Sequence, residues 1–166
     1  MFSDMEEVPE NIKEGDKYIS NKDLFDILVK YANLSPGEKY SKSNVYSQFI
    51  SEERFVTRAE AVNFIISFLQ EVQDFKTNEQ LLSASDEEKY GYKFRDWSSM
   101  PPEYKDSVLV ALKVGSVIGY LDNTLRLSDY ITTNEALAVL ARLKYGEVSR
   151  RESESRDRRS EYMDIV

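Results

Sequence analysis

The sequence contains neither cysteine nor histidine. Without them the chain can form no disulfide bond, no thiolate or imidazole metal site, and no Ser-His or Cys-His catalytic pair. Glycine and proline are scarce, with six and four copies in 166 residues, which argues against a turn-dense, strand-rich fold and against a disordered linker. Apolar runs are all shorter than the roughly 18 residues that a bilayer requires, so no membrane span is predicted.

Positive charge is also in deficit, with 22 basic against 30 acidic residues and a net charge of −8. Nucleic-acid binding needs a basic face, so the charge argues against nucleic acid as a partner. Acidic side chains abound, but no pair is singled out for glycoside hydrolysis, and we predict no catalytic residue, metal or cofactor. Residues 1–16 lack the apolar run of a signal peptide. An intracellular protein and a mature part of an exported one both stay open.

Three segments share one pattern, an apolar residue, then Ser or Thr, then an acid three positions after the hydroxyl. They are Ile19 to Asp23, Val56 to Glu60 and Ile131 to Glu135. This spacing is typical of a capping box, in which the hydroxyl and the acid each accept a backbone N–H of the first helical turn. The expected structural caps are Ser20, Asp23, Thr57, Thr132 and Glu135. Three copies indicate an internal repeat.

Apolar spacing extends the capped segments into helices. They are expected at about 21–33, 57–72 and 133–144. The second has an unusually wide apolar face, which predicts a helix contacted from more than one side. A shorter helix is expected near 43–50. Another should begin at Pro101-Pro102 and end at Gly115 in the left-handed conformation.

The connections carry fewer apolar residues. Residues 73–93 are rich in Asp, Glu, Lys and Ser, and we predict a long exposed loop there with one helical turn near 79–83. Residues 117–120 are expected to be extended. Asp122-Asn123-Thr124 is typical of a tight turn in which Asn123 takes a positive φ.

An ordered set of motifs covers about fifty residues, from Phe94 to Leu143. The set comprises Phe94-x-Asp96, Gly119-Tyr120-x-Asp122-Asn123-Thr124 and Ile131-Thr132-x-x-Glu135. It resembles the repeat unit of the S-layer homology (SLH) family. Val56-Thr57-Arg58-Ala59-Glu60 is a nearly perfect copy of that family's five-residue signature. Ile19 to Asp23 resembles it more weakly, and Phe2-x-Asp4 resembles the opening of a unit.

The resemblance implies an all-α fold, a pseudo-threefold bundle of SLH-like helical repeats with short outer prongs and a long loop. We expect one domain over 1–146, with units at about 1–34, 35–72 and 73–146. The charged tail at 147–166 is expected to be poorly ordered.

That family attaches exported bacterial proteins noncovalently to the cell wall by binding a secondary cell-wall polysaccharide, often one with a pyruvate ketal. The resemblance therefore implies an extracellular location at the wall or S-layer, with glycan held in grooves between the prongs. The residues expected to bind glycan are Arg58, Glu60, Trp97, Tyr120 and Arg126. A guanidinium fork at a helix start with free N–H groups suits a carboxylate, so we expect Arg58 to hold the ketal and Glu60 to orient Arg58 or to bond a sugar hydroxyl. Trp97 also fits a core position.

Departures from the family pattern keep an alternative open. The signature arginine is replaced by Asn21 in the first copy and Thr133 in the third. The chain would then be a module that keeps the fold, has lost glycan binding, and serves in protein interaction or assembly, including self-association. Changing Arg58 to alanine is expected to abolish wall retention at little loss of stability under the first hypothesis and to leave partner binding intact under the second.

Overall fold

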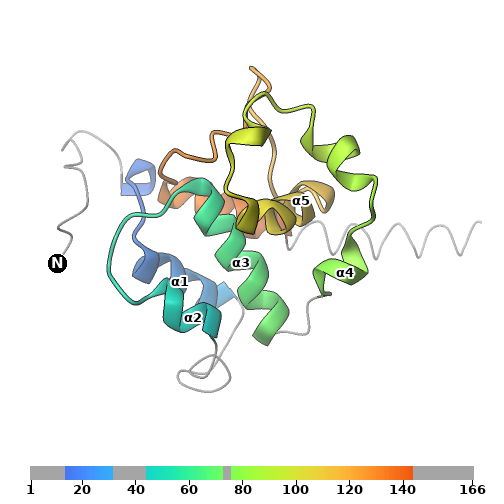
Figure 1. The fold of residues 1–166 in the computed structure, drawn as a ribbon. Helices are drawn as coiled ribbons and strands as arrows, with labels where there is room; N and C mark the ends of the chain where they lie inside the picture. Colours follow the sequence, from blue (N-terminus) through green and yellow to red (C-terminus); the bar gives the residue numbers. More distant parts are fainter. Residues whose placement is uncertain (1–13, 32–43, 73–75, 144–166) are drawn as a thin grey trace, which may run out of the picture.

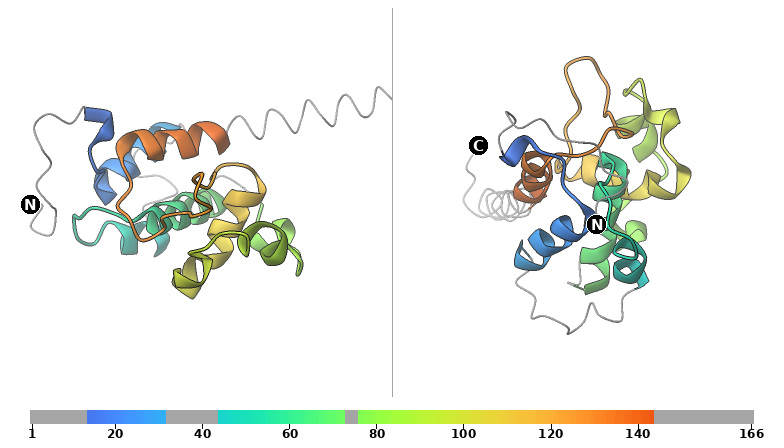
Figure 2. Two further views of the ribbon diagram at one scale, coloured as in Figure 1. Left: turned by 90° about the horizontal axis from the view of Figure 1, so that it is seen from above. Right: turned by 90° about the vertical axis from the view of Figure 1, so that its left-hand side faces the viewer.

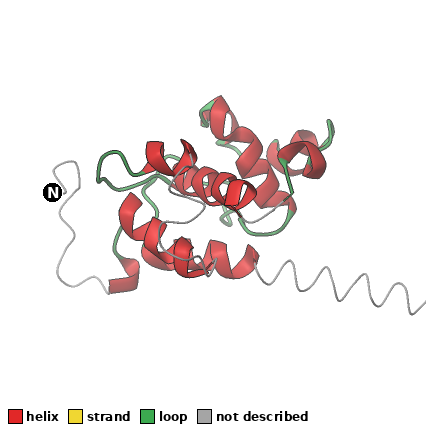
Figure 3. Cartoon of the chain, turned by 90° about the horizontal axis from the view of Figure 1, so that it is seen from below, coloured by secondary structure: helices red, strands yellow, loops and turns green. Residues whose placement is uncertain are grey.

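A computed structural model describes residues 14–31, 44–72 and 76–143. Regular structure in these ranges is helical, and Figure 3 shows no strand in them. The predicted all-α class is therefore confirmed. None of the described helices is both long enough and apolar enough to cross a bilayer. The tail at 147–166 and the Phe2-x-Asp4 motif lie outside the described residues.

Six α-helices lie in the described part of the chain. They are α1 (Asn21–Tyr31), α2 (Asn44–Phe49), α3 (Arg58–Val72), α4 (Asn78–Leu81), α5 (Lys105–Lys113) and a last helix over 133–143. Single helical turns lie at Glu14–Asp16, Glu87–Gly91, Trp97–Ser99 and Pro102–Tyr104. The helices predicted near 21, 57, 101 and 133 are all present, as is the short helix near 44.

The predicted caps hold the starts of α1, α3 and the last helix. In each one the hydroxyl accepts the N–H of the acid three positions later, at 3.1 Å for Ser20, 3.2 Å for Thr57 and 3.2 Å for Thr132. Glu60 and Glu135 also accept the N–H of their own capping threonine, which closes both boxes. The box predicted at α1 is only half formed, because the Asp23 N–H bonds Ser20 but the Asp23 carboxylate makes no return bond to the Ser20 N–H. Each cap of this kind stabilises a helix by about 0.5–2 kcal/mol. A fourth box, which the sequence reading missed, joins Thr77 and Gln80 at α4.

Three lead-in segments, residues 17–20, 54–57 and 129–132, are joined to one another in a closed cycle. Isolated β-bridges pair Tyr18 with Thr132, Ser20 with Phe55, and Thr57 with Tyr130. The first residue of each helix donates its N–H to the next lead-in, from Asn21 to Arg54 at 2.8 Å, from Arg58 to Asp129 at 2.9 Å, and from Thr133 to Lys17 at 3.0 Å. The three capped helices therefore begin side by side.

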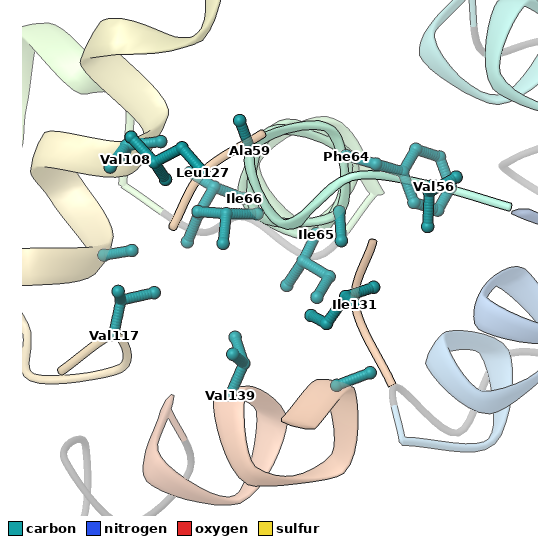
Figure 4. Packing of buried hydrophobic residues seen from close by; sticks show 14 of the residues in the cluster. Val56, Ala59, Phe64, Ile65, Ile66, Val108, Val117, Leu127, Ile131 and Val139 are labelled. Carbon is teal, nitrogen blue, oxygen red and sulfur yellow. The ribbon is translucent and has the colours of Figure 1, made fainter. Parts of the chain in front are cut away.

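Helix α3 forms the centre of the molecule, with α1 and α2 on one side and α5 on the other (Figure 1). The last helix, orange in Figure 2, lies beside α1. Phe64, Ile65, Ile66 and Phe68 of α3 are almost completely buried. Figure 4 shows α3 end-on, with side chains of α5 and of the last helix directed toward it. A helix contacted on several sides was predicted from its wide apolar face, and this is confirmed.

The exposed loop predicted at 73–93 is confirmed in part for its described residues, since most of their side chains are exposed and α4 supplies the helical turn expected near 79–83. Besides α4, residues 87–91 form a π turn, and Leu81, Leu82 and Tyr90 are partly buried against the core. Asp86 is only 4% exposed, and its carboxylate accepts the Lys113 ammonium of α5 and the Ser83 N–H, each at 2.8 Å. A polar segment can therefore still contact the core, because its one buried acid is paired with a lysine 27 positions away.

Residues 94–104 precede α5, and residues 114–128 connect α5 to the lead-in of the last helix. The Asp96 carboxylate accepts the N–H groups of Leu125 at 2.9 Å and Arg126 at 2.8 Å, so the Phe-x-Asp motif holds the later turn directly. Phe94 lies against Gly119 so closely that any Cβ there would overlap its ring. Gly115 and Asn123 take the predicted positive φ values, 81° and 62°.

Candidate functional site

Arg58, at the first position of α3, is largely buried, with 8% of its surface exposed. Its Nη1 donates to the Arg126 carbonyl at 2.7 Å, and its Nη2 forms an ion pair with the Glu135 carboxylate. Burial lowers the pKa of the guanidinium, against an opposing effect of Tyr120 and Asp129, but arginine stays protonated in proteins. Arg58 therefore joins α3 to the last helix.

The expected free N–H groups at the start of α3 are absent. All four N–H groups of the first turn have acceptors, namely Asp129 O for Arg58, Leu127 O for Ala59, Thr57 Oγ1 for Glu60 and Thr57 O for Ala61. The expectation that they receive an anion is wrong. The carbonyls of Leu127 and Asp129 take two of these donors, the Thr57 hydroxyl takes one, and the fourth makes the ordinary helical bond to the Thr57 carbonyl.

Tyr120 connects the charged groups around Arg58. Its hydroxyl donates to Glu135 Oε2 at 2.8 Å, so one carboxylate oxygen serves both Tyr120 and Arg58. The guanidinium carbon of Arg126 lies 3.8 Å from the ring centroid, and that of Arg58 lies at 5.2 Å. Cation–π contacts of this kind stabilise the pair by about 0.5–2 kcal/mol each. Three of the five predicted glycan-binding residues, Arg58, Tyr120 and Arg126, thus lie together.

Arg126 holds an unusual backbone conformation beside Arg58. Its φ is 50°, in the left-handed region that non-glycine residues rarely adopt. Asp96 accepts its N–H and Arg58 donates to its carbonyl, so both backbone groups are fixed. Its side chain is 46% exposed and lies 3.6 Å from the Asp122 carboxylate. Local strain persists only where surrounding contacts impose it, and it often occurs at functional sites.

Two hollows flank Tyr120, Arg58 and Glu135, which form a wall common to both. One has a volume of about 440 Å³ and is mainly polar; we call it the polar pocket. Its other lining residues are Tyr18, Arg126, Ser128, Asp129, Tyr130 and Thr132. The second, of about 340 Å³, is mainly apolar and lies between the last helix and residues 117–120.

Aromatic rings of the three lead-ins contact one another, and two of them, Tyr18 and Tyr130, line the polar pocket. Tyr18, Phe55 and Tyr130 have ring centroids 5.4 to 5.7 Å apart in each pairing. Tyr18 is 38% exposed, so part of its ring is accessible. These residues were missed by the sequence reading, although each stands directly before the apolar residue of a capped segment. The repeated aromatic residue before each capped segment was a sequence signal that could have identified them.

The other two predicted glycan-binding residues lie elsewhere. Glu60, expected to orient Arg58, instead pairs with Arg54 at 2.8 Å. Trp97 is buried, with 7% exposed, and packs so closely on Gly91 that a Cβ there would lie 2.7 Å from its ring. Its large apolar surface places it in the core, outside both hollows. The adjacent residue Asp96, and not Trp97, contacts the site, by accepting the Arg126 N–H.

A separate hollow of about 360 Å³ adjoins Arg54 and Glu60. The side-chain amide of Asn21, which stands where the second segment has Arg58, donates to the Phe49 carbonyl at 2.8 Å and the Glu52 carbonyl at 2.6 Å. Tyr104 lines the hollow, and burial, followed by the nearby Glu60 carboxylate, raises the pKa of its hydroxyl. This hollow has an arginine and a glutamate, as the polar pocket does. The position equivalent to Arg58 is Asn21, however, and its side-chain amide bonds backbone carbonyls.

The described residues contain no cluster of three or more acids that could hold a metal ion. Compared with models of protein families, with curated proteins and with solved structures, the chain matches none. The residues and geometry of the polar pocket therefore carry the functional argument alone.

Proposed function

We propose that this chain is a non-catalytic anchoring module that holds a protein on the bacterial cell surface by binding secondary cell-wall polysaccharide. The polar pocket is the proposed binding site, with Tyr18, Tyr120, Tyr130 and Arg126 as contact residues. The observation that carries the proposal is this pocket, which combines aromatic rings, hydroxyls and charged groups beside the signature residue Arg58. Sugars are held by such a combination, because rings cover their C–H faces and polar groups bond their hydroxyls.

The proposal includes an architecture of three related units about a pseudo-threefold axis. The cyclic bonding of the lead-ins supports it, because each of the three helix starts donates to the equivalent residue of the next lead-in. The polar pocket would then be the groove between the second and third units, with Arg58 from one and Glu135 from the other. An extracellular location at the wall or S-layer is part of the same proposal.

A sedimentation assay with purified cell walls tests the proposal. The chain should pellet with intact walls and stay in solution with walls from which the secondary polysaccharide has been chemically extracted. Tyr18→Ala should reduce retention several-fold, because it removes the exposed ring. Tyr92→Ala is the matched control, since Tyr92 is 62% exposed but lines none of the hollows described above. Equal pelleting with intact and extracted walls, or equal loss in both variants, contradicts the proposal.

An assembly module is the second candidate function. An apolar groove lies between α1 and the last helix, lined by Ile27, Tyr31, Leu137 and Leu140, and Leu137 is 45% exposed. A second copy of the chain is the occupant that this candidate requires. Light scattering should then show a dimer that Leu137→Glu dissociates and that Leu121→Glu, at a fully exposed position outside the groove, leaves intact. A monomer at all concentrations rejects self-association.

A further inference from the structure

We infer that the polar pocket selects an uncharged saccharide and that Glu135 is the residue that excludes acidic sugars from it. The inference rests on the proposed function and specifies the chemical class of its ligand. It departs from the pyruvate ketal that the family resemblance implies, and the charges around Arg58 are the reason.

The charges that line the polar pocket cancel. Arg58 and Arg126 supply two positive charges, and Asp129 and Glu135 supply two negative ones. Each arginine already has a carboxylate partner, Glu135 for Arg58 and the nearby Asp122 for Arg126. An anion entering the pocket would therefore find no uncompensated cation, and it would meet the exposed Asp129 carboxylate.

Arg58 cannot be released from its partner easily. The Arg58 side chain is 10% exposed, and one nitrogen is fixed to the Arg126 carbonyl while another faces Glu135. A ligand carboxylate would have to displace Glu135 and leave that charge with only the Tyr120 hydroxyl and the capping N–H. Taking the partner from the buried Arg58 and leaving the partly buried Glu135 carboxylate without its arginine is unfavourable.

The groups that do face the pocket suit a neutral polyol. Ser128 and Asp129 are exposed, and the Tyr18 ring is partly accessible. Sugar hydroxyls donate readily to a carboxylate such as Asp129, and these charge-assisted bonds are stronger than neutral ones. A sugar face can lie on the Tyr18 ring at the same time.

Calorimetric titration with two ligands tests the inference. The probes are a purified wall-polysaccharide fragment that carries its pyruvate ketal and the same fragment after the ketal has been chemically removed. The wild-type chain should bind the uncharged fragment about tenfold more tightly, since a like charge a few ångströms from the ketal is repulsive. Added salt should change the affinity for the uncharged fragment little.

Glu135→Gln is the decisive variant. It keeps an acceptor for the Thr132 N–H, since glutamine also closes a capping box, but it frees the Arg58 charge. The preference for the uncharged fragment should disappear or reverse. Glu60→Gln is the matched control, because Glu60 holds the equivalent cap at α3 but pairs with Arg54 outside the pocket, and it should keep the wild-type preference.

Asp129→Asn provides a second variant should Glu135→Gln fail to fold. Its side chain is exposed, and its structural contact to Arg58 uses the backbone carbonyl, which the substitution keeps. It should raise affinity for the ketal fragment several-fold. Tighter wild-type binding of the ketal fragment, or an unchanged preference in these variants, overturns the inference and leaves the proposed function standing. Binding of neither fragment rejects the proposed function, and the inference with it.

Discussion

Arg58 and Glu135, 77 positions apart in the sequence, form a side-chain ion pair at the starts of two adjacent helices. Glu135 at the same time closes the cap of its own helix and accepts the Tyr120 hydroxyl. One carboxylate thus fixes a helix start, an arginine and an aromatic ring. The pair is both a structural joint and one wall of the candidate site.

Removing Arg58 should destabilise the fold, contrary to the expectation from the sequence. Arg58→Ala leaves a partly buried carboxylate and an unpaired carbonyl, so we expect a loss of about 2–4 kcal/mol of unfolding free energy. Urea denaturation measures it. Arg54→Ala is the comparison, since the Arg54 side chain is 32% exposed against 10% for Arg58, and this variant should lose about 1 kcal/mol or less. Equal losses would contradict the structural role given to Arg58.

The Asp86–Lys113 pair should make stability depend on pH. The hydrogen bond from Lys113, with the N–H of Ser83, lowers the pKa of the Asp86 carboxyl from its ordinary 3.8. A lowered folded-state pKa gives stability that is present above the ordinary value and is lost as the pH falls through the folded value. Thermal unfolding between neutral pH and about pH 2 should show this loss for the wild type. Asp86→Asn should reduce it, while Asp106→Asn, at an exposed position on α5, should not.

The turn at Asn123 should tolerate glycine better than alanine. Asn123 is exposed and has a φ of 62°, a conformation that costs most residues with a Cβ about 1–2 kcal/mol. We expect Asn123→Ala to destabilise the fold by about 1 kcal/mol and Asn123→Gly to stay within about 0.5 kcal/mol of the wild type. Chemical denaturation of both variants measures the difference, and a more stable alanine variant would refute this account of the turn.

Gly119 should accept no side chain. A Cβ at this position would overlap the Phe94 ring, so Gly119→Ala must displace either Phe94 or the segment before Tyr120. Forced overpacking of this kind typically lowers stability by about 1–3 kcal/mol. Phe94→Leu added to Gly119→Ala should recover part of that loss. Gly115→Ala lacks any such contact, and its effect should come from its positive φ alone, so Phe94→Leu should not rescue it.

Local signals predicted local structure well. The boxes at Thr57 and Thr132 involve atoms within three positions of each other, so spacing alone predicted them and the helices they begin. The left-handed residues Gly115 and Asn123 follow from the same short-range chemistry. The partner of Arg58 could not be found in this way, because Glu60 is close in sequence but Glu135 is close in space.

The composition of residues 76–93 predicted exposure correctly for most of their side chains but could not predict which acid is buried. Most of these side chains are polar, yet Asp86 is buried because Lys113 and a backbone N–H supply its bonds. The polarity of a segment indicates how exposed its side chains are on average. It does not indicate that one acid in the segment is buried in an ion pair. At the candidate site the sequence did contain a usable signal. Tyr18 and Tyr130 occupy the same position before two capped segments, and this repetition was overlooked.

The cyclic contacts among the lead-ins bear on how the chain can fold. In a linear array of repeats each end needs a protective outer layer, and shorter arrays remain partly stable. The closed cycle of lead-ins has no outermost member. Removing any one lead-in therefore leaves the other two with unpaired backbone groups. Folding should therefore be all-or-none across α1, α3 and the last helix, and an isolated piece bearing only two of them should collapse without acquiring fixed structure.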